Sequence, residues 1–285
     1  MLNADTAVRV SGLRKQYGDV DAVSGVDIDI RRGEVFALLG PNGAGKTTTV
    51  EILEGYRRRD GGTVEVLGED PQRAGRAWRA RIGIVLQLAS EAEATELTVR
   101  EMVRHFAGFY PRPKDPDEVI GLVGLTAKAR SRIHQLSGGQ LRRLDVALGI
   151  VGSPELMFLD EPTTGFDPEA RRQFWTLIED LSGSGTTILL TTHYLDEAEA
   201  LADRVAVISG GRIRATGPPA DLGGRAARAA SVSWQDGDGR RSMRTDEPTR
   251  VVAELGARYG GEVPGLTVTR PTLEDIYLEL IGSAQ

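Results

Sequence analysis

The sequence predicts an α/β fold built around a parallel β-sheet. Short apolar segments of strand length alternate with segments of helical spacing through most of the 285 residues, and this alternation is typical of parallel sheets. Three such segments lie in the second half of the chain, at residues 155–160 (ELMFLD), 186–193 (TTILLTTH) and 204–213 (RVAVISGGRI). We expect each of them to form a buried strand, with helices between them.

The first part of the chain supplies further strands and a helix. Residues 20–30 (VDAVSGVDIDI) alternate apolar and polar side chains, which is the pattern of a half-buried strand. Residues 34–40 (EVFALLG) form an apolar run that ends at glycine, and residues 63–67 and 82–86 also have strand character. Helical spacing in residues 46–56 predicts a helix directly after the strand at 34–40.

A mostly helical insert is expected between about residues 88 and 152. Thr98 and Glu101 have the spacing of a capping box, which predicts a helix start. Residues 116–125 predict a second helix, and the segment from His134 (HQLSGGQLRRLDVALG) a third.

The α/β pattern ends at Gly217-Pro218-Pro219, where we place a domain boundary. We expect residues 1–217 to form the main domain. Residues 218–285 are then a small accessory α+β domain, with a hairpin around a DGDG turn and two helices flanking a strand.

Composition excludes several functional classes. Hydrophobic residues make up 40% of the chain and charged residues 27%, values typical of a globular protein. The net charge of −6 argues against nucleic-acid binding, and the absence of cysteine excludes disulfides. No segment has the pattern of a signal peptide or the roughly 20 apolar residues of a membrane-spanning helix. We therefore expect a cytosolic chain that reaches a membrane only through a partner.

Residues 40–47 (GPNGAGKT) match G-x-x-x-x-G-K-[ST], with a predicted strand before and a helix after. Such a loop turns backbone N–H groups toward phosphate oxygens, and the next helix offers its positive dipole end. Lys46 is expected to reach the β- and γ-phosphates and Thr47 to bind Mg²⁺. The predicted nucleotide-binding residues are Gly40, Pro41, Asn42, Gly43, Ala44, Gly45, Lys46, Thr47 and Thr48.

Two carboxylates, Asp160 and Glu161, end the predicted strand at 155–160. Ligands of open α/β sheets bind at the carboxyl ends of the strands. Adjacent residues of an extended strand point to opposite sides, so we predict different roles for the two acids. Asp160 would hold Mg²⁺ and Glu161 would activate water as a general base. An acid that only caps the next helix is the alternative, and the phosphate-binding loop in the same chain favours catalysis.

Two more polar residues directly follow predicted strands. Gln87 comes after residues 82–86 and His193 after the apolar run that starts at Thr186. Both should therefore lie at the same edge of the sheet as Asp160. We expect Gln87 to touch Mg²⁺ or the attacking water, and His193 to contact the γ-phosphate.

Together these motifs resemble the ATP-binding subunits of ABC transporters, over roughly residues 7–217. The further motifs are the signature LSGGQ at 136–140, the strand LMFLDE, and a loop that ends at Asp167. The resemblance implies a P-loop NTPase core, with a RecA-like parallel sheet and an N-terminal antiparallel β subdomain. It also implies ATP and Mg²⁺ as ligands, and Tyr17 stacked on adenine.

The resemblance further implies a homodimer that holds ATP between its subunits. The phosphate-binding loop and the signature are two separate anion-binding helix starts, and one nucleotide in one chain does not need both. ATP on one subunit would therefore meet the signature of the other, through Ser137, Gly138, Gly139 and Gln140.

The tail at residues 270–282 (RPTLEDIYLELIG) resembles drug- and polysaccharide-type exporter ATPases, including the daunorubicin-resistance group. This implies an integral-membrane ABC-2-type permease as a separate chain, contacted through the helical insert, with this subunit peripheral at the cytoplasmic face. The alternatives are an importer ATPase, or an ABC ATPase that acts on ribosomes or DNA. The single cassette and the acidic balance argue against the second alternative.

Overall fold

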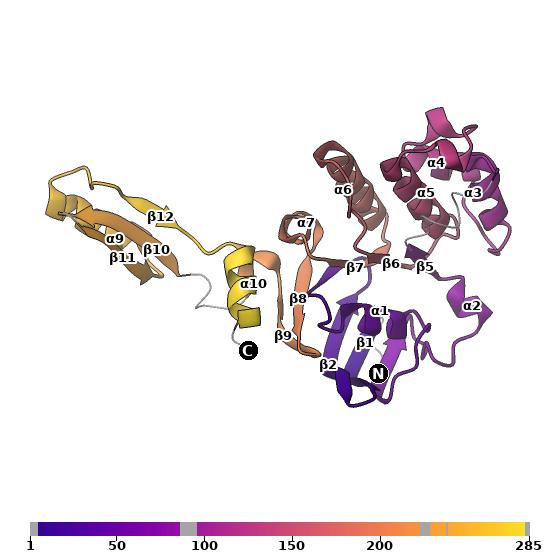
Figure 1. Ribbon diagram of the computed structural model, residues 1–285, viewed down its shortest axis with the longest axis horizontal. Helices are drawn as coiled ribbons and strands as arrows, with labels where there is room; N and C mark the ends of the chain where they lie inside the picture. Colours follow the sequence, from indigo (N-terminus) through magenta and orange to yellow (C-terminus); the bar gives the residue numbers. More distant parts are fainter. Residues whose placement is uncertain (1–4, 86–95, 223–228, 238, 283–285) are drawn as a thin grey trace.

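The computed structural model describes residues 5–85, 96–222, 229–237 and 239–282. Its centre is a six-stranded sheet in the order β5-β6-β7-β3-β8-β9 (Figure 1). The neighbouring pairs from β5 to β8 are parallel, as predicted, and only β9 runs antiparallel. In chain order these strands are β3 (Val35–Leu39), β5 (Ile82–Val85), β6 (Leu156–Asp160), β7 (Thr187–Thr192), β8 (Arg204–Ser209) and β9 (Arg212–Gly217).

A second, antiparallel sheet packs on one face of the central sheet. It has the order β2-β1-β4, formed by β1 (Thr6–Tyr17), β2 (Val20–Arg31) and β4 (Gly61–Val66). The helix α1 (Lys46–Leu53) follows β3 and precedes β4 in the chain, and it shares the apolar cluster between the two sheets. The short helix α2 (Arg76–Arg79) follows β4 and buries Trp78 in the same cluster. This arrangement agrees with the N-terminal antiparallel subdomain that the motifs implied.

The opposite face of the central sheet is covered by helices. The insert contributes α3 (Val99–Ala107), α4 (Pro116–Leu122) and α5 (Gly138–Ile150), with short 3₁₀ turns at Thr126–Lys128 and Ile133–Gln135. Of these, α5 contacts β5, and α3 and α4 pack against α5. After β6 comes α6 (Pro168–Gly183), and after β7 comes α7 (Leu195–Leu201). The capping box predicted at Thr98 is present, because its hydroxyl accepts from Glu101 N–H and the Glu101 carboxylate accepts from Thr98 N–H.

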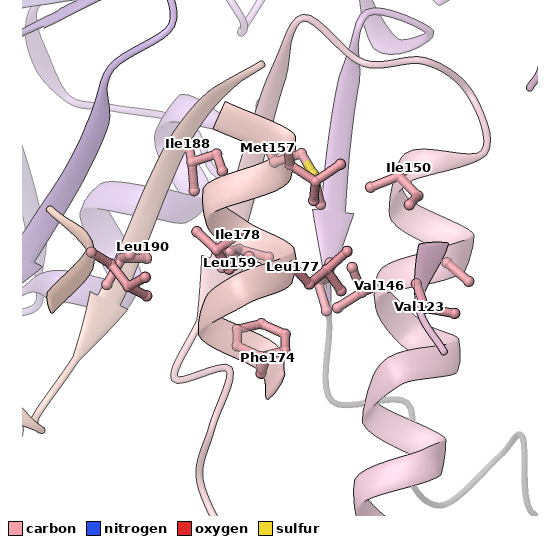
Figure 2. Close-up of a cluster of buried hydrophobic side chains, with 14 of the residues drawn as sticks. Val123, Val146, Ile150, Met157, Leu159, Phe174, Leu177, Ile178, Ile188 and Leu190 are labelled. Carbon is pink, nitrogen blue, oxygen red and sulfur yellow. The ribbon is translucent and has the colours of Figure 1, made fainter. Parts of the chain in front are cut away.

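Alternation along the buried strands divides the core between the two faces. In β3, Phe36 and Leu38 face the antiparallel sheet, whereas Val35, Ala37 and Leu39 face the helices. Figure 2 shows side chains of β6 and β7 packed against α6, with α5 alongside. Each fully buried side chain of this size contributes about 1.5–3 kcal/mol of transfer free energy, so this packing fixes the strand ends that carry the polar motifs.

The segment at 204–213 differs from the prediction of a single strand. It forms β8, a turn at Gly210-Gly211, and the antiparallel edge strand β9. Both turn glycines have positive φ, at 57° and 70°, the backbone that a tight two-residue hairpin turn requires. The apolar content of the segment concealed this reversal, so the single-strand prediction was wrong.

The residues after Gly217 begin with a 3₁₀ turn (Pro219–Asp221) and a third sheet, in the order β11-β10-β12. Its strands are β10 (Ala230–Asp236), β11 (Gly239–Thr245) and β12 (Thr267–Thr269), and α9 (Pro248–Tyr259) covers one face. The last helix, α10 (Leu273–Gly282), returns to pack beside α7 and β8 (Figure 1). Within the described residues, no helix is both long and apolar enough to cross a membrane.

Candidate active site

The carboxyl ends of three neighbouring strands lie together at one edge of the central sheet. In the parallel register, Leu39 of β3 pairs with Thr192 of β7, and Thr191 of β7 pairs with Asp160 of β6. The loop after β3, the acids after β6 and the histidine after β7 are therefore positioned by adjacent strands. The strand ends therefore meet at one edge of the sheet, and β3 and β7 are buried along their whole length.

A cavity of about 480 Å³ opens at this edge. It joins the glycine-rich loop to both carboxylates and to the tyrosine at the end of β1. The lining residues are Tyr17, Ala22, Pro41, Asn42, Gly43, Gly45, Lys46, Thr47, Thr48, Asp160 and Glu161. Of the predicted loop residues, Gly40 and Ala44 lie behind this wall; Ala44 is buried against the neighbouring core.

The conformation of the glycine-rich loop requires glycine at position 45 and leaves the N-terminus of α1 available to an anion. Gly45 has φ 104°, and a Cβ there would lie 2.4 Å from the carbonyl oxygen of Ala22, so only glycine fits. Gly45 is also the N-cap of α1, and it offers no side chain to that helix end. The first N–H groups of α1 therefore have no side-chain cap and are available to phosphate oxygens.

Lys46 is buried at the start of α1. Its Nζ donates hydrogen bonds to the carbonyl oxygens of Gly40, at 2.7 Å, and Pro41, at 3.3 Å. Burial lowers the pKa of Lys46, and the negative charges of Glu161 and Asp160 oppose that effect. The Lys46 ammonium is thus hydrogen-bonded to two neutral carbonyl oxygens of the loop. A phosphate is negatively charged and would form stronger hydrogen bonds with it.

The two carboxylates line the same cavity, contrary to the prediction that they point to opposite sides. The prediction was wrong because β6 ends at Asp160, and Glu161 leaves the strand with φ 44°. This left-handed backbone is uncommon for a non-glycine residue and turns the second acid toward the first. Thr191 stabilises the turn, because its carbonyl oxygen accepts from Glu161 N–H at 3.0 Å and its hydroxyl donates to Asp160.

His193 contacts the site through Glu161 rather than through the cavity wall. Its Nδ1 lies 3.3 Å from Oε2 of Glu161. The imidazole stands beside the Tyr194 ring, with 4.1 Å between the ring centroids. His193 is not one of the described residues that line the cavity. The structure therefore joins the predicted base to the predicted histidine as a pair.

Tyr17 lies at the cavity mouth with 40% of its surface exposed. Two cations flank the ring: Nζ of Lys15 is 5.4 Å, and Cζ of Arg57 is 5.3 Å, from its centroid. The Tyr17 ring can stack on a nucleobase, and the two cations beside it can attract the negative charge of phosphates. Gln87, predicted to act beside these residues, lies outside the described part of the chain.

The signature residues lie in a different cavity, of about 530 Å³, at the start of α5. Ser137 is the N-cap of α5: its hydroxyl accepts from Gln140 N–H, and the Gln140 side chain accepts from Ser137 N–H at 3.1 Å. Gly138 does not have a left-handed backbone, and a Cβ there would meet no described atom within 4 Å. The two cavities have no lining residue in common.

Arg142 is a site residue that sequence reasoning missed. It is buried on α5, and its guanidinium donates to the carbonyl oxygens of Pro162, at 3.0 Å, and Asp160, at 2.8 Å. Asp145, one turn further, lies 3.6 Å away; burial raises its pKa to about 6 and Arg142 opposes the rise. An arginine and an aspartate three residues apart on the same helix were the available signal.

Residues 23–164 match the profile of the family described as "ABC transporter". The chain is 38% identical to the daunorubicin resistance ATP-binding protein DrrA3 of Streptomyces coeruleorubidus, over 98% of this chain and 97% of that protein. It is 43% identical to the Nod factor export ATP-binding protein I of Ralstonia nicotianae, over 75% of this chain and 67% of that protein.

A solved structure shares the fold over most of the chain. The dimer of an ATP-binding cassette in a post-hydrolysis state, bound to ADP and phosphate, has a TM-score of 0.65 and 22% sequence identity. The match covers 74% of this chain and 98% of that one. At this identity the comparison shows the fold alone.

Proposed function

The chain belongs to the family of ABC transporter ATP-binding subunits and is an ATPase that powers export, and we propose how its residues do so. The observation that carries the proposal is the single cavity that joins Lys46 to both Asp160 and Glu161. A cation for the phosphates and two acids at the same edge are what hydrolysis of a nucleoside triphosphate requires.

We assign the binding roles from the lining of this cavity. The backbone N–H groups of residues 40–48 hold the phosphates, with Lys46 moving from the loop carbonyls to the β- and γ-phosphates. The adenine stacks on Tyr17. The donor set fits Mg²⁺, because Thr47 and Asp160 offer hard oxygen ligands in the same cavity and leave positions for phosphate and water. Gln87 is a further proposed ligand. Mg²⁺ would neutralise the charge that develops on the phosphates.

Glu161 is the proposed general base. It takes a proton from the attacking water, while the acid itself is held by its left-handed turn and by His193 at 3.3 Å. His193 is placed to contact the γ-phosphate once the cavity is occupied. Arg142 holds the backbone of Asp160, so the α5 helix of the signature and the end of β6 move together.

The separate cavities favour a head-to-tail homodimer. Family members dimerise, and the cassette structure described above is itself a dimer. In one chain the signature residues line a cavity of their own. We propose that Ser137, Gly138, Gly139 and Gln140 bind the γ-phosphate of ATP held by the other subunit, so that binding closes the dimer and hydrolysis reopens it.

We propose an ABC-2-type permease as the membrane partner and a drug, antibiotic, lipid or polysaccharide as cargo. Cassettes of this family act with membrane permease subunits, and the relatives named above are a daunorubicin-resistance protein and a Nod factor exporter. On this proposal the chain is peripheral at the cytoplasmic face of the membrane. Residues 218–285 are proposed as an accessory domain attached to the cassette of residues 1–217.

The test is Glu161→Gln. We expect hydrolysis to slow by ~10²–10⁴, the usual contribution of a general base, while ATP binding persists and size-exclusion chromatography shows an ATP-dependent dimer. Glu179→Gln, which removes an exposed carboxylate of α6, is the matched control and should keep wild-type turnover. Wild-type hydrolysis by Glu161→Gln contradicts the base, and a monomer at every ATP concentration contradicts the shared site.

A further inference from the structure

Glu197 is a fully buried carboxylate on α7 that the proposed mechanism does not use. α7 starts directly after His193 and Tyr194. Burial raises the pKa of Glu197, and none of its carboxyl oxygens has a hydrogen-bond partner of good geometry among the described residues. Burial of an acid in this way is costly, and a core that needed only packing would be more stable with an apolar side chain.

Three other residues with unpaired buried polar groups lie near this carboxylate. The Thr163 hydroxyl, the Trp175 indole N–H and Nε of Arg171 are also buried without a partner among the described residues. Thr192, Thr163 and Trp175 are near enough that their hydrogen-bonding groups lower the pKa of Glu197, as does the charge of Arg171. Potential donors from several elements therefore surround one acceptor, but the hydrogen bonds between them are not formed in this structure.

Two of these donors belong to the segments that carry the reacting groups. Thr163 lies two residues after Glu161, and Thr192 immediately precedes His193. The hydroxyl oxygen of Thr192 accepts from Tyr194 N–H at 3.0 Å, which leaves its proton free to be donated. Trp175 lies on α6, and its indole N–H is a third potential donor to the carboxylate. The Glu197 carboxylate is thus near both the loop that carries Glu161 and the end of β7, which carries His193.

We propose that Glu197 is a positioning residue for hydrolysis: its carboxylate accepts from Thr163 and Thr192 when ATP closes the dimer, and so fixes Glu161 relative to His193. This inference rests on the proposed roles of Glu161 and His193. Closing the network satisfies donors that are otherwise buried and unpaired, so it stabilises the closed geometry without any contact between Glu197 and nucleotide. Small displacements of reacting groups have large effects on rate, which makes such a residue effective at a distance.

The experiment compares ATP hydrolysis by the full-length protein and three variants. Glu197→Gln keeps the size of the side chain but replaces one acceptor oxygen with an N–H₂ group, and Thr163→Val removes the hydroxyl on the loop side. We expect both to lower kcat by ~10- to 100-fold, the usual cost of losing a group that orients a site residue, with KM and ATP affinity unchanged. Glu199→Gln, on the same helix but facing Leu273, is the control and should keep wild-type kcat.

A double variant separates positioning from general weakening. Because Glu197 acts through the base, Glu197→Gln should cause no further loss in a Glu161→Gln background. Wild-type kcat in both Glu197→Gln and Thr163→Val, or full additivity in the double variant, overturns the proposal. If Glu161→Gln itself hydrolyses ATP normally, the base assignment fails, and a kcat loss in Glu197→Gln then supports positioning of His193 alone. If Glu197→Gln does not fold, Thr163→Val and its double variant with Glu161→Gln decide the question.

Discussion

Gly138→Ala should make the free chain more stable and the ATPase inactive. Gly138 lies in the first turn of α5, without a left-handed backbone, and an added Cβ would meet no described atom within 4 Å. Nothing within the chain therefore opposes alanine, which is better than glycine in a helix by about 0.5–1 kcal/mol. For a protein of this size that is a rise in Tm of about 1–4 °C.

The same methyl group should block the site that we propose for the phosphate of the second subunit's ATP. A Cβ at this position keeps the N–H groups of α5 from approaching a phosphate closely, and loss of one preorganised donor lowers turnover by ~10²–10³. Gly183→Ala is the matched control: Gly183 ends α6, is exposed, and also has open space around its Cα. It should raise Tm by a similar amount and keep wild-type turnover.

The assay pairs thermal unfolding without nucleotide with steady-state ATP hydrolysis. ATP-dependent dimerisation is measured in a Glu161→Gln background, where we expect Gly138→Ala to abolish the dimer. Normal turnover by Gly138→Ala would show that no phosphate needs this glycine. A fall in Tm would show that contacts within the chain, rather than a partner's nucleotide, require it.

Two further predictions concern charged side chains. Lys46→Ala should abolish binding of a fluorescent ATP analogue as well as turnover, because it removes the cation of the cavity; retained binding would contradict its assigned role. Glu155→Gln should lower Tm at pH 7, because hydrogen bonds from Arg81 and Arg32 hold the pKa of Glu155 at about 2, below the ordinary 4.5. That stabilisation is complete above pH 4.5 and is lost as pH falls toward 2, so the Tm difference from wild type should shrink over this range; a constant difference would contradict the ion pairs.

Local patterns were sufficient to predict most of the elements. The length and apolar character of β3, β6 and β7 predicted buried parallel strands, and the capping box at Thr98 predicted the start of α3. These features are decided within a few residues by hydrogen bonding and burial. The glycine-rich loop at residues 40–47 is equally local, and Lys46 lines the same cavity as both acids.

The details that sequence could not supply depend on tertiary contacts. Strand alternation placed Asp160 and Glu161 on opposite sides, but the turn at Glu161 depends on Thr191 of a neighbouring strand. The buried position of Arg142 depends on the carbonyl groups of Asp160 and Pro162, which the sequence of its own helix does not identify. The donors around Glu197 come from three other elements, so no spacing in the sequence reveals them.

The tail that resembles exporter ATPases is also the part of the C-terminal segment that contacts the cassette. Thr272 and Asp275 cap α10, with the Thr272 hydroxyl accepting from Asp275 N–H at 3.2 Å. Leu273 is buried in the helical face of the main core, and its N–H donates to Glu199 of α7 at 3.1 Å. Since α7 begins next to His193 and carries Glu197, α10 rests on the helix that leads to the proposed hydrolytic pair. α10 is therefore packed on the main core beside α7, whereas β10 and α9 share a separate apolar cluster.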